Sequence, residues 1–436
     1  MSELLTARPH IQVNGFGFGD EGKGTTVDYL ASLTDEAGRK LFTTIVKTNG
    51  GAQTAHNVIT NDGRHHTFAQ FGSGTFSGTQ TFLSRFCLVN PLALHRESEY
   101  LAEVGIGGAL DLVSVDPRAL ITTPFHAEVN RARELARGGD HHGSCGVGIG
   151  ETMVYAKQFG DDAPVMVDCA NPASMRRKLA KLYDYYKSAG FAVDAVIPVA
   201  ELVEIYELLA RMIKITDEDY LTELLTSDRV IFEGAQGVLL DQWYAFHPHA
   251  TYSTTTFENG QTLLAEAGQD GTATRLGVIR AYQTRHGAGP MPTESEDLSR
   301  AVPDVHNGRG AFTGDFRVGH LDLVLLRYAL EVAGDPDCWS LTNLDRVEAE
   351  PRFTYTRAYE IDGQRIERLI PSSQHDLDYQ RALTAQLWAA QPILEARPGS
   401  FVEIVEDFSQ IPVGLLSVGA RTVDKMLREE WSLKVT

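Results

Sequence analysis

The stretch IQVNGFGFGDEGKGTTVDYL, residues 11–30, joins a short apolar run to a glycine-rich loop and then to a helical pattern. The glycines of the loop are Gly15, Gly17, Gly19, Gly22 and Gly24. Glycine lets the main chain approach an anion closely, and the first turn of a helix adds unpaired N–H donors at the positive end of the helix dipole. The stretch therefore predicts a strand, a loop and a helix that together bind a phosphate or a nucleotide.

The same loop departs from an ordinary phosphate-binding loop. Lys23 is followed by Gly24 and not directly by a hydroxyl residue, and the acidic pair Asp20-Glu21 stands where phosphate charge should lie. A solvated turn is one interpretation of such a loop. The other is that a carboxylate beside a bound polyphosphate acts as a metal ligand, or as a base that takes a proton from a second substrate.

Composition excludes several classes of protein. The chain has 436 residues, a formal net charge of −19 and four cysteines without a CxxC pair. The charge argues against a nucleic-acid surface, which normally carries a basic stripe, and the cysteines suit a reducing compartment and provide no zinc framework. No apolar run approaches the ~20 residues of a membrane span, and the amino end lacks a secretory apolar segment. We therefore expect a cytoplasmic protein that binds neither nucleic acid nor membrane.

Strand and helix patterns alternate along the chain. Strands are predicted at residues 43–48, 228–237, 340–347 and 412–419, and helices at residues 176–189, at residues 200–214 and from near His320. No repeat, long linker or low-complexity segment interrupts this alternation. We expect one continuous α/β domain, residues 1–436, with ligands bound at the ends of its strands.

Some polar residues at turns have two interpretations when taken alone. His56 is either structural or functional, and Ser144, in a second glycine-rich loop, either donates to an anion or belongs to a surface turn. Asp345 follows a strand, where a carboxylate can accept hydrogen bonds from N1 and the amino group of guanine, or can cap a helix. His247 and His249 have no third ligand nearby, so we expect no metal site there.

Taken together, these stretches resemble the adenylosuccinate synthetase family. The matching motifs are GDEGKG (Gly19–Gly24), GGAQTAH (Gly50–His56), GSCGVGIG (Gly143–Gly150), FEGAQGVLLD (Phe232–Asp241), TRHGAGPMPTE (Thr284–Glu294), LDLVLLRYA (Leu321–Ala329), LTNLD (Leu341–Asp345) and LLSVG (Leu415–Gly419). They occur in the order of the family, at compatible separations, over nearly the whole chain. The resemblance implies an α/β fold with a large central, mostly parallel β-sheet flanked by helices, with inserted smaller subdomains, in a homodimer.

Members of this family join IMP to L-aspartate at the expense of GTP in purine synthesis. The resemblance implies that GTP phosphorylates O6 of the purine and that the amine of aspartate then displaces the phosphate. Asp20 matches the base that takes the N1 proton and, with the carbonyl of Ala55, a ligand of Mg²⁺. His56 matches the acid that supports charge on the transferring phosphoryl group, Lys23 the phosphate cradle, and Gln236 the residue that holds the purine near O6.

The remaining implied contacts divide by ligand. The implied GTP-binding residues are Gly19, Glu21, Gly22, Gly24, Thr25, Asn57, Arg317, Asn343, Asp345, Ser417 and Gly419. The implied IMP-binding residues are Asp20, Lys23, Gln53, Ser144, Cys145, Gln236 and Thr251. The loop that grips the amine substrate comprises Thr313, Gly314, Asp315 and Arg317.

Several positions depart from the family pattern. Thr25 stands where a lysine is usual, and Asn343 replaces the lysine of the family's TKLD motif. Gln53 replaces an asparagine, and Cys145 replaces a threonine that helps to hold the IMP phosphate. No arginine after GVGIGE matches the one that reaches the partner's nucleotide across the dimer; Lys157 is a candidate for that role.

The largest departure is Asp315, in a loop where the family carries an arginine that binds the carboxylate of aspartate. Truncating one partner of a buried charge pair costs about 2–5 kcal/mol, and reversing its sign should cost more unless another cation, such as Arg309, compensates. Two enzyme hypotheses follow: the IMP–aspartate ligase, and a specialised paralogue that acts on a different purine nucleotide or amine. A third hypothesis is a non-catalytic GTP-binding regulator, which the presence of both Asp20 and His56 disfavours.

Overall fold

The centre of the molecule is a ten-stranded sheet. The computed structural model describes residues 8–138, 144–304, 314–397 and 399–428. In spatial order the strands are β20 (Lys425–Leu427), β19 (Val413–Ser417), β15 (Cys338–Thr342), β11 (Ala273–Arg280), β1 (His10–Gly15), β10 (Val230–Gly237), β2 (Thr44–Lys47), β5 (Gln80–Leu83), β7 (Val113–Val115) and β9 (Lys214–Ile215). Every neighbouring pair is parallel except β19 and β20. The predicted mostly parallel sheet is confirmed.

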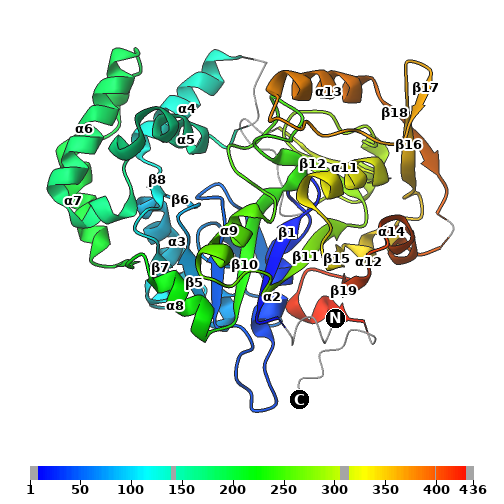
Figure 1. Cartoon of the computed structure of the whole chain (residues 1–436), viewed down its shortest axis with the longest axis horizontal. Helices are drawn as coiled ribbons and strands as arrows, with labels where there is room; N and C mark the ends of the chain where they lie inside the picture. Colours follow the sequence, from blue (N-terminus) through cyan, green and yellow to red (C-terminus); the bar gives the residue numbers. More distant parts are fainter. Residues whose placement is uncertain (1–7, 139–143, 305–313, 398, 429–436) are drawn as a thin grey trace.

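Strand β1 lies in the middle of this sheet, between β10 and β11 (Figure 1). Ile11 and Val13 are fully buried, as expected for a strand with covered faces. After β1 the glycine loop turns the chain into α2 (Lys23–Ser32), whose Val27 and Leu30 pack in the same core as Ile11. The predicted strand, loop and helix are confirmed.

A group of helices forms a second core on the side of the sheet that ends in β7 and β9. Figure 1 shows these helices at the left and upper left, away from β1. Their buried side chains include Phe125, Leu179 and Tyr206. The helices are α3 (Pro91–Glu103), α4 (Pro124–Ala136), α5 (Ile149–Phe159), α6 (Pro172–Ser188) and α7 (Val199–Ala210). The helix predicted at residues 176–189 is confirmed as α6. The helix predicted at residues 200–214 is confirmed as α7 only up to Ala210, because Lys214 belongs to β9.

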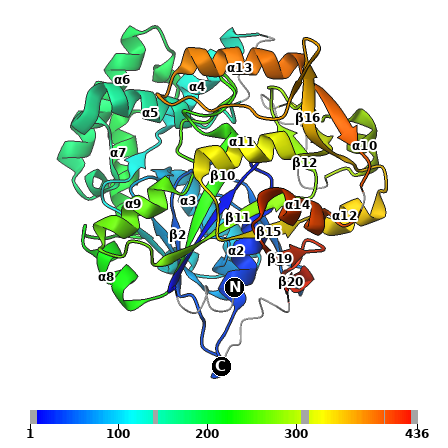
Figure 2. The same ribbon diagram turned by 45° about the vertical axis from the view of Figure 1, so that its right-hand side comes forward.

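The opposite side carries a small sheet and further helices (Figure 2). The sheet contains β14 (Leu321–Asp322), β16 (Tyr355–Ile361), β17 (Gln364–Ile366) and β18 (Gln391–Glu395), and α13 (Leu377–Ala389) lies near it. Helix α11 (Leu323–Ala333) was expected to begin near His320 but begins at Leu323, because the Asp322 side chain accepts a hydrogen bond from the Leu325 N–H at 3.0 Å and caps it.

The remaining elements connect these layers. They are α8 (Tyr220–Ser227), α9 (Glu258–Glu266), α10 (Glu296–Ala301), α12 (Leu344–Ala349), α14 (Phe401–Ser409), β3 (His56–Ile59), β4 (His65–Phe68), β6 (Leu88–Val89), β8 (Leu120–Ile121), β12 (Gln283–His286) and β13 (Phe316–Gly319). The strand predicted at residues 340–347 ends at Thr342, since Asn343 adopts φ 60° and turns the chain into α12.

The carboxyl ends of the central strands meet at one edge of the sheet, where ligands bind in open α/β folds. Asp20 follows β1, Gln236 is near the end of β10, Arg280 ends β11, Asn343 follows β15 and Ser417 ends β19. The topology therefore gathers the candidate residues from five strands. In the part of the chain that the structure describes, no helix has the length and apolar character needed to cross a membrane.

Candidate active site

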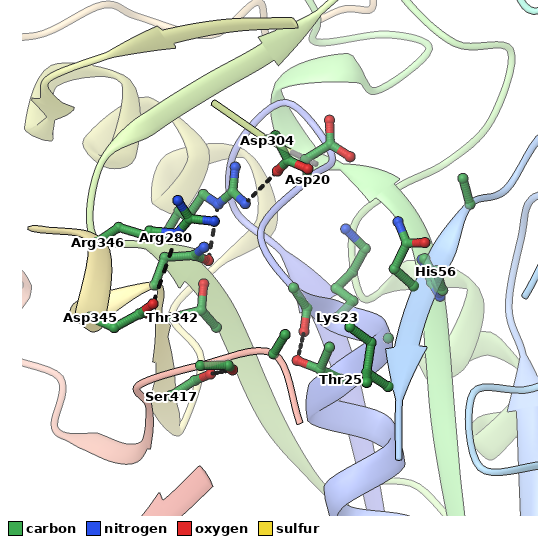
Figure 3. A pocket seen from close by; sticks show the side chains of 18 of the residues that line it. Asp20, Lys23, Thr25, His56, Arg280, Asp304, Thr342, Asp345, Arg346 and Ser417 are labelled. Atoms are coloured by element: carbon green, nitrogen blue, oxygen red, sulfur yellow. Dashed lines mark hydrogen bonds and ion pairs between the residues drawn. The ribbon is translucent and has the colours of Figure 1, made fainter. Parts of the chain in front are cut away.

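A cavity of about 190 Å³ lies at this edge of the sheet (Figure 3). The candidate residues that line it are Gly19, Asp20, Gly22, Lys23, Gly24, Thr25, Ala55, His56, Asn57, Asn343, Asp345, Ser417 and Gly419. The lining also contains residues that the sequence analysis missed, namely Ile59, Arg280, Asp304, Thr342, Arg346 and Ala420. The structure thus brings together the predicted phosphate loop, His56 and the predicted guanine-binding residues.

The glycine loop is held in shape by its own charged side chains. The carboxylate of Glu21 accepts hydrogen bonds from the N–H groups of Gly17 and Gly19 at 2.9 and 2.7 Å, and it pairs with Lys23 at 2.6 Å. A Cβ at Gly15 would lie 2.1 Å from the Glu21 carboxylate and would displace it from this position. The Glu21 side chain is therefore turned inward, and any contact of Glu21 with a nucleotide would come from its main chain.

Asp20 lies at the tip of this loop and lines the cavity. Burial raises the pKa of its carboxyl group, and the nearby side chains of Arg280 and His286 oppose that shift. A carboxylate with a raised pKa is a better proton acceptor than an ordinary aspartate. The position and basicity of Asp20 suit a group that takes a proton from a bound substrate.

His56 belongs to a buried network on β3 and β10. Its Nδ1 lies 2.5 Å from a carboxylate oxygen of Glu233, which also accepts a 2.5 Å hydrogen bond from the Ser73 hydroxyl group. Burial would raise the pKa of Glu233, but Lys47, His56 and Ser73 outweigh it and lower that pKa to about 2. Glu233 is therefore ionised, and its carboxylate accepts a hydrogen bond from the Nδ1–H of His56 and so orients the imidazole.

The opposite end of the cavity contains Asp345, in the first turn of α12. Its Oδ1 is buried and has no hydrogen-bond partner among the described residues. Such an acceptor requires a donor, and the paired N–H groups of guanine suit a carboxylate. Ser417 lies nearby, and its hydroxyl group donates to the Gly419 carbonyl group at 3.1 Å.

Lys425, which the sequence analysis missed, holds the loop after β19 that contains Gly419. It is 5% exposed and donates to the carbonyl groups of Gly419 and Arg421 at 2.9 and 3.0 Å. Burial lowers its pKa to about 8, against the nearby carboxylates of Asp424 and Asp28. A charged donor on two carbonyl groups makes Lys425 a positioning residue of the loop.

Replacing Lys425 with methionine should loosen the loop. Each unsatisfied buried carbonyl group costs about 1–3 kcal/mol, so we expect the KM for the nucleoside triphosphate to rise ~10-fold or more while kcat changes less. Lys425→Arg retains a charged donor and should recover most of the affinity. Steady-state kinetics test this, and an unchanged KM in Lys425→Met would rule out the positioning role.

The residues predicted to bind IMP do not line this cavity with their side chains, apart from Asp20 and Lys23. Gln236 adopts φ 64° in the bend that adjoins Gly19, and the charge of Asp20 contributes to raising the pKa of the Cys145 thiol, after burial. Both atoms of the Gln53 carboxamide are buried without a partner among the described residues. Gln236 and Cys145 therefore lie close to Gly19 and Asp20, which line the cavity.

The other two predicted IMP contacts have local partners. The Ser144 hydroxyl group accepts a hydrogen bond from Asn130 at 3.0 Å, and the Thr251 N–H donates to the Leu240 carbonyl group at 2.9 Å. Neither side chain lines the cavity.

The described residues of the predicted amine-substrate loop, Gly314, Asp315 and Arg317, do not line the cavity either. Arg317 pairs with Glu294 at 2.7 Å and donates to the carbonyl groups of Gly287 and Gly289, both at 2.8 Å. Its guanidinium group thus holds the neighbouring loop in the absence of substrates. Gly314 adopts φ 75°, and Asp315 follows it. Thr313 and the proposed compensating residue Arg309 lie outside the described residues.

The oxygen donors suit a magnesium ion. Asp20 and Asp304 contribute carboxylates to the cavity, and Ala55, whose carbonyl group is the second predicted ligand, lines it as well. The described residues contain no cluster of three or more His, Cys, Asp or Glu side chains that could enclose a metal. Mg²⁺ does not need such a cluster, because it is usually held by one or two carboxylates together with substrate phosphates and water.

Comparisons with known proteins agree with this geometry. The profile of the family described as adenylosuccinate synthetase matches residues 12–426. The chain is 31% identical to an adenylosuccinate synthetase of Streptomyces coelicolor, over 94% of this chain and 97% of the relative. It is 27% identical to the enzyme of the same name from Limosilactobacillus reuteri, over 97% and 98%.

Two solved structures share the fold. Adenylosuccinate synthetase from Plasmodium falciparum, in a fully ligated structure, matches 96% of this chain and 99% of that chain, with a TM-score of 0.79 at 19% identity. Cyanophage S-2L succinoaminodeoxyadenylate synthetase, bound to dGMP and dATP, matches 96% of this chain and 95% of that chain, with a TM-score of 0.61 at 14% identity.

Proposed function

The chain belongs to the adenylosuccinate synthetase family, and we propose that it joins IMP to L-aspartate with GTP as the phosphoryl donor. Its membership makes it a GTP-using ligase that forms a C–N bond in purine nucleotide biosynthesis. The observation that carries the proposal is that Asp20, Lys23 and His56 line one cavity with Asp345 at its other end.

The chemistry follows from these positions. Asp20 takes the N1 proton of IMP, so that negative charge develops on O6. O6 attacks the γ-phosphorus of GTP and GDP leaves, while His56 and the loop N–H groups stabilise charge on the transferring phosphoryl group. The α-amine of aspartate then attacks C6, inorganic phosphate leaves and the nitrogen loses a proton. Phosphorylation is needed because a carbonyl oxygen is a poor leaving group.

Magnesium belongs to this proposal. Asp20, with the Ala55 carbonyl group, would hold Mg²⁺, which neutralises phosphate charge when bound. Gln53, Ser144, Cys145, Gln236 and Thr251 stay proposed contacts of IMP, and Gly314, Asp315 and Arg317 stay proposed residues of the amine-substrate loop. We also propose that the chain acts as one domain, in a cytoplasmic homodimer.

The proposal is tested by incubating the protein with GTP, Mg²⁺, and a panel of purine monophosphates and amines. We expect adenylosuccinate and phosphate in equal amounts from IMP and aspartate. A different productive pair would identify a specialised paralogue, which Asp315 motivates. GTP binding without phosphate transfer to any acceptor would identify a regulator and contradict the proposed ligase.

Replacing Asp345 with asparagine should change the preferred base. The amide cannot accept both guanine N–H groups, but its NH₂ can donate to the O2 of xanthine. We expect the KM for GTP to rise ~10- to 100-fold, the range for losing a hydrogen bond to a charged group, and the KM for XTP to fall. An unaltered GTP:XTP ratio of kcat/KM would contradict the assigned role of Asp345.

A further inference from the structure

Arg280 is a buried cation that lines the cavity. It was not among the site residues that the motifs implied, and it has no role in the proposed mechanism. It ends β11, and its side chain is 10% exposed. Its Nε donates to the Asn343 side-chain oxygen at 3.0 Å, and its Nη2 donates to Asp304 at 3.3 Å. Its Nη1 is buried and has no partner among the described residues. Two hydrogen bonds thus hold the planar group, whose Cζ also lies 5.1 Å from the Tyr282 ring centre and 5.7 Å from that of Phe316. Nη1 is left for a ligand.

The other cations that line the cavity are less suited to bind an anion in this state. Lys23 is paired with Glu21 at 2.6 Å and also donates to the Gly19 carbonyl group at 2.6 Å. Arg346 is 38% exposed and lies 3.9 Å from the Asp345 carboxylate. Among the described residues, Arg280 is the cavity-lining cation that combines deep burial with an unpartnered nitrogen.

The sequence indicates why the nucleotide site needs the charge of Arg280. Thr25 and Asn343 occupy positions where the family usually has lysine, so the nucleotide site lacks two expected cations. Asn343 is instead the anchor of the Arg280 guanidinium group. An arginine held by two contacts is preorganised, keeps its charge at any working pH and offers a directed donor to phosphate.

The position of Arg280 determines which part of a bound nucleotide its side chain can contact. Figure 3 shows it between Asp345, at the end assigned to guanine, and Asp20, at the tip of the phosphate loop. Arg280 and Asp20 are close enough for each charge to shift the other's pKa. A nucleotide that extends from Asp345 to the loop N–H groups would pass its phosphates beside Nη1.

We propose that Arg280 is a catalytic residue that binds the β- and γ-phosphate oxygens of the nucleoside triphosphate through Nη1. It stabilises the charge that develops as the γ-phosphoryl group is transferred, and so replaces the missing lysines. The identity of the triphosphate as GTP rests on the proposed function. Asp304 holds the guanidinium group in place and keeps the empty cavity from carrying an uncompensated positive charge.

The test compares Arg280→Gln and Arg280→Lys with Arg275→Gln. Arg275 lies on the same strand at its other end, away from the cavity, and is the matched control. Calorimetry with GMP, GDP and GTP measures affinity along the phosphate chain. We expect Arg280→Gln to weaken the binding of GTP and GDP ~10- to 100-fold and the binding of GMP by less than about twofold. We also expect kcat to fall ~100-fold or more. Arg280→Lys keeps the charge without the fork and should be intermediate, and Arg275→Gln should match the wild type.

Several results would overturn the inference. Equal weakening of GMP, GDP and GTP would mean that Arg280 only supports the fold, and a rise confined to the KM for aspartate would assign it to the carboxylate of the amino acid. If Arg280→Gln does not fold, Arg280→Lys decides, because wild-type affinity for GTP and wild-type kcat in that variant would exclude a directed phosphate contact. If the wild type forms no adenylosuccinate but the GTP and GMP affinities separate as expected, the proposed function fails and the role of Arg280 stands.

Discussion

Replacing Asp20 with asparagine should lower kcat for adenylosuccinate formation by ~10³-fold or more, with little effect on folding. The amide is nearly isosteric but cannot take the N1 proton, and loss of a general base typically costs 10²–10⁴-fold. It also removes a charged ligand from the proposed magnesium site, so the loss should lie at the upper end of that range. Steady-state assays measure the loss of kcat, and circular dichroism with thermal unfolding measures whether the variant folds.

Two comparisons make the Asp20 result specific. Asp304→Asn removes another of the cavity carboxylates without removing the proposed base and should cost less in kcat than Asp20→Asn. Asp20→Glu keeps a carboxylate on a side chain that is one methylene longer. It should recover part of the lost kcat if Asp20 acts by accepting a proton. Residual turnover of Asp20→Asn within tenfold of the wild type would contradict the assignment.

Replacing Glu233 with glutamine should have the second-largest effect, a loss of ~10²- to 10³-fold in kcat with a smaller change in KM. Glu233 touches no substrate in this account; it fixes the tautomer of His56 and stabilises the imidazolium, as orienting carboxylates do behind catalytic histidines. Ser73→Ala leaves the carboxylate in place and should cost less than tenfold.

The pH dependence separates orientation from a structural role. Burial lowers the pKa of His56 below its ordinary value although Glu233 opposes the shift, so the imidazole is neutral at pH 7 in the absence of ligands. The triphosphate adds negative charge and should raise that pKa. GTP binding should therefore take up protons and strengthen as pH falls from 8 towards 6.

Calorimetry in buffers of different ionisation enthalpy measures this uptake. In Glu233→Gln the uptake should shrink, because the charge that supports the imidazolium is lost. Equal uptake in both proteins, or a kcat for Glu233→Gln equal to that of the wild type, would show that Glu233 does not act through His56.

Local patterns predicted much of the fold. The strand, loop and helix at residues 11–30 followed from apolar spacing and glycines, and β2, β10 and β19 followed from apolar runs. Two of the elements had wrongly predicted boundaries, in each case at a position where a single residue ends or begins the element. Asn343 in the left-handed region stopped β15 and began α12, and the Asp322 cap moved the start of α11. Apolar periodicity reports neither feature: the Asp322 cap is a local hydrogen bond to the Leu325 N–H, and Asn343 is tied to Arg280, 63 residues away.

The motifs predicted many of the residues that line the cavity, although Thr251 and Arg317, which also come from motifs, do not line it. Partners that lie far apart along the chain were missed. His56 and Glu233 are 177 residues apart, and Arg280 meets Asn343 across 63 residues. Each had a signal that could have been used. Glu233 is a carboxylate in an otherwise apolar strand, and Arg280 is a cation at the carboxyl end of a strand, where ligands bind in such sheets.

The central claim is that removing the N1 proton makes the purine O6 a nucleophile towards GTP. It is tested most directly with IMP carrying ¹⁸O at O6, together with GTP, Mg²⁺ and aspartate, followed by mass spectrometry of the released phosphate. The account predicts one ¹⁸O atom in each phosphate, formed in step with adenylosuccinate. Unlabelled phosphate released alongside adenylosuccinate would contradict it.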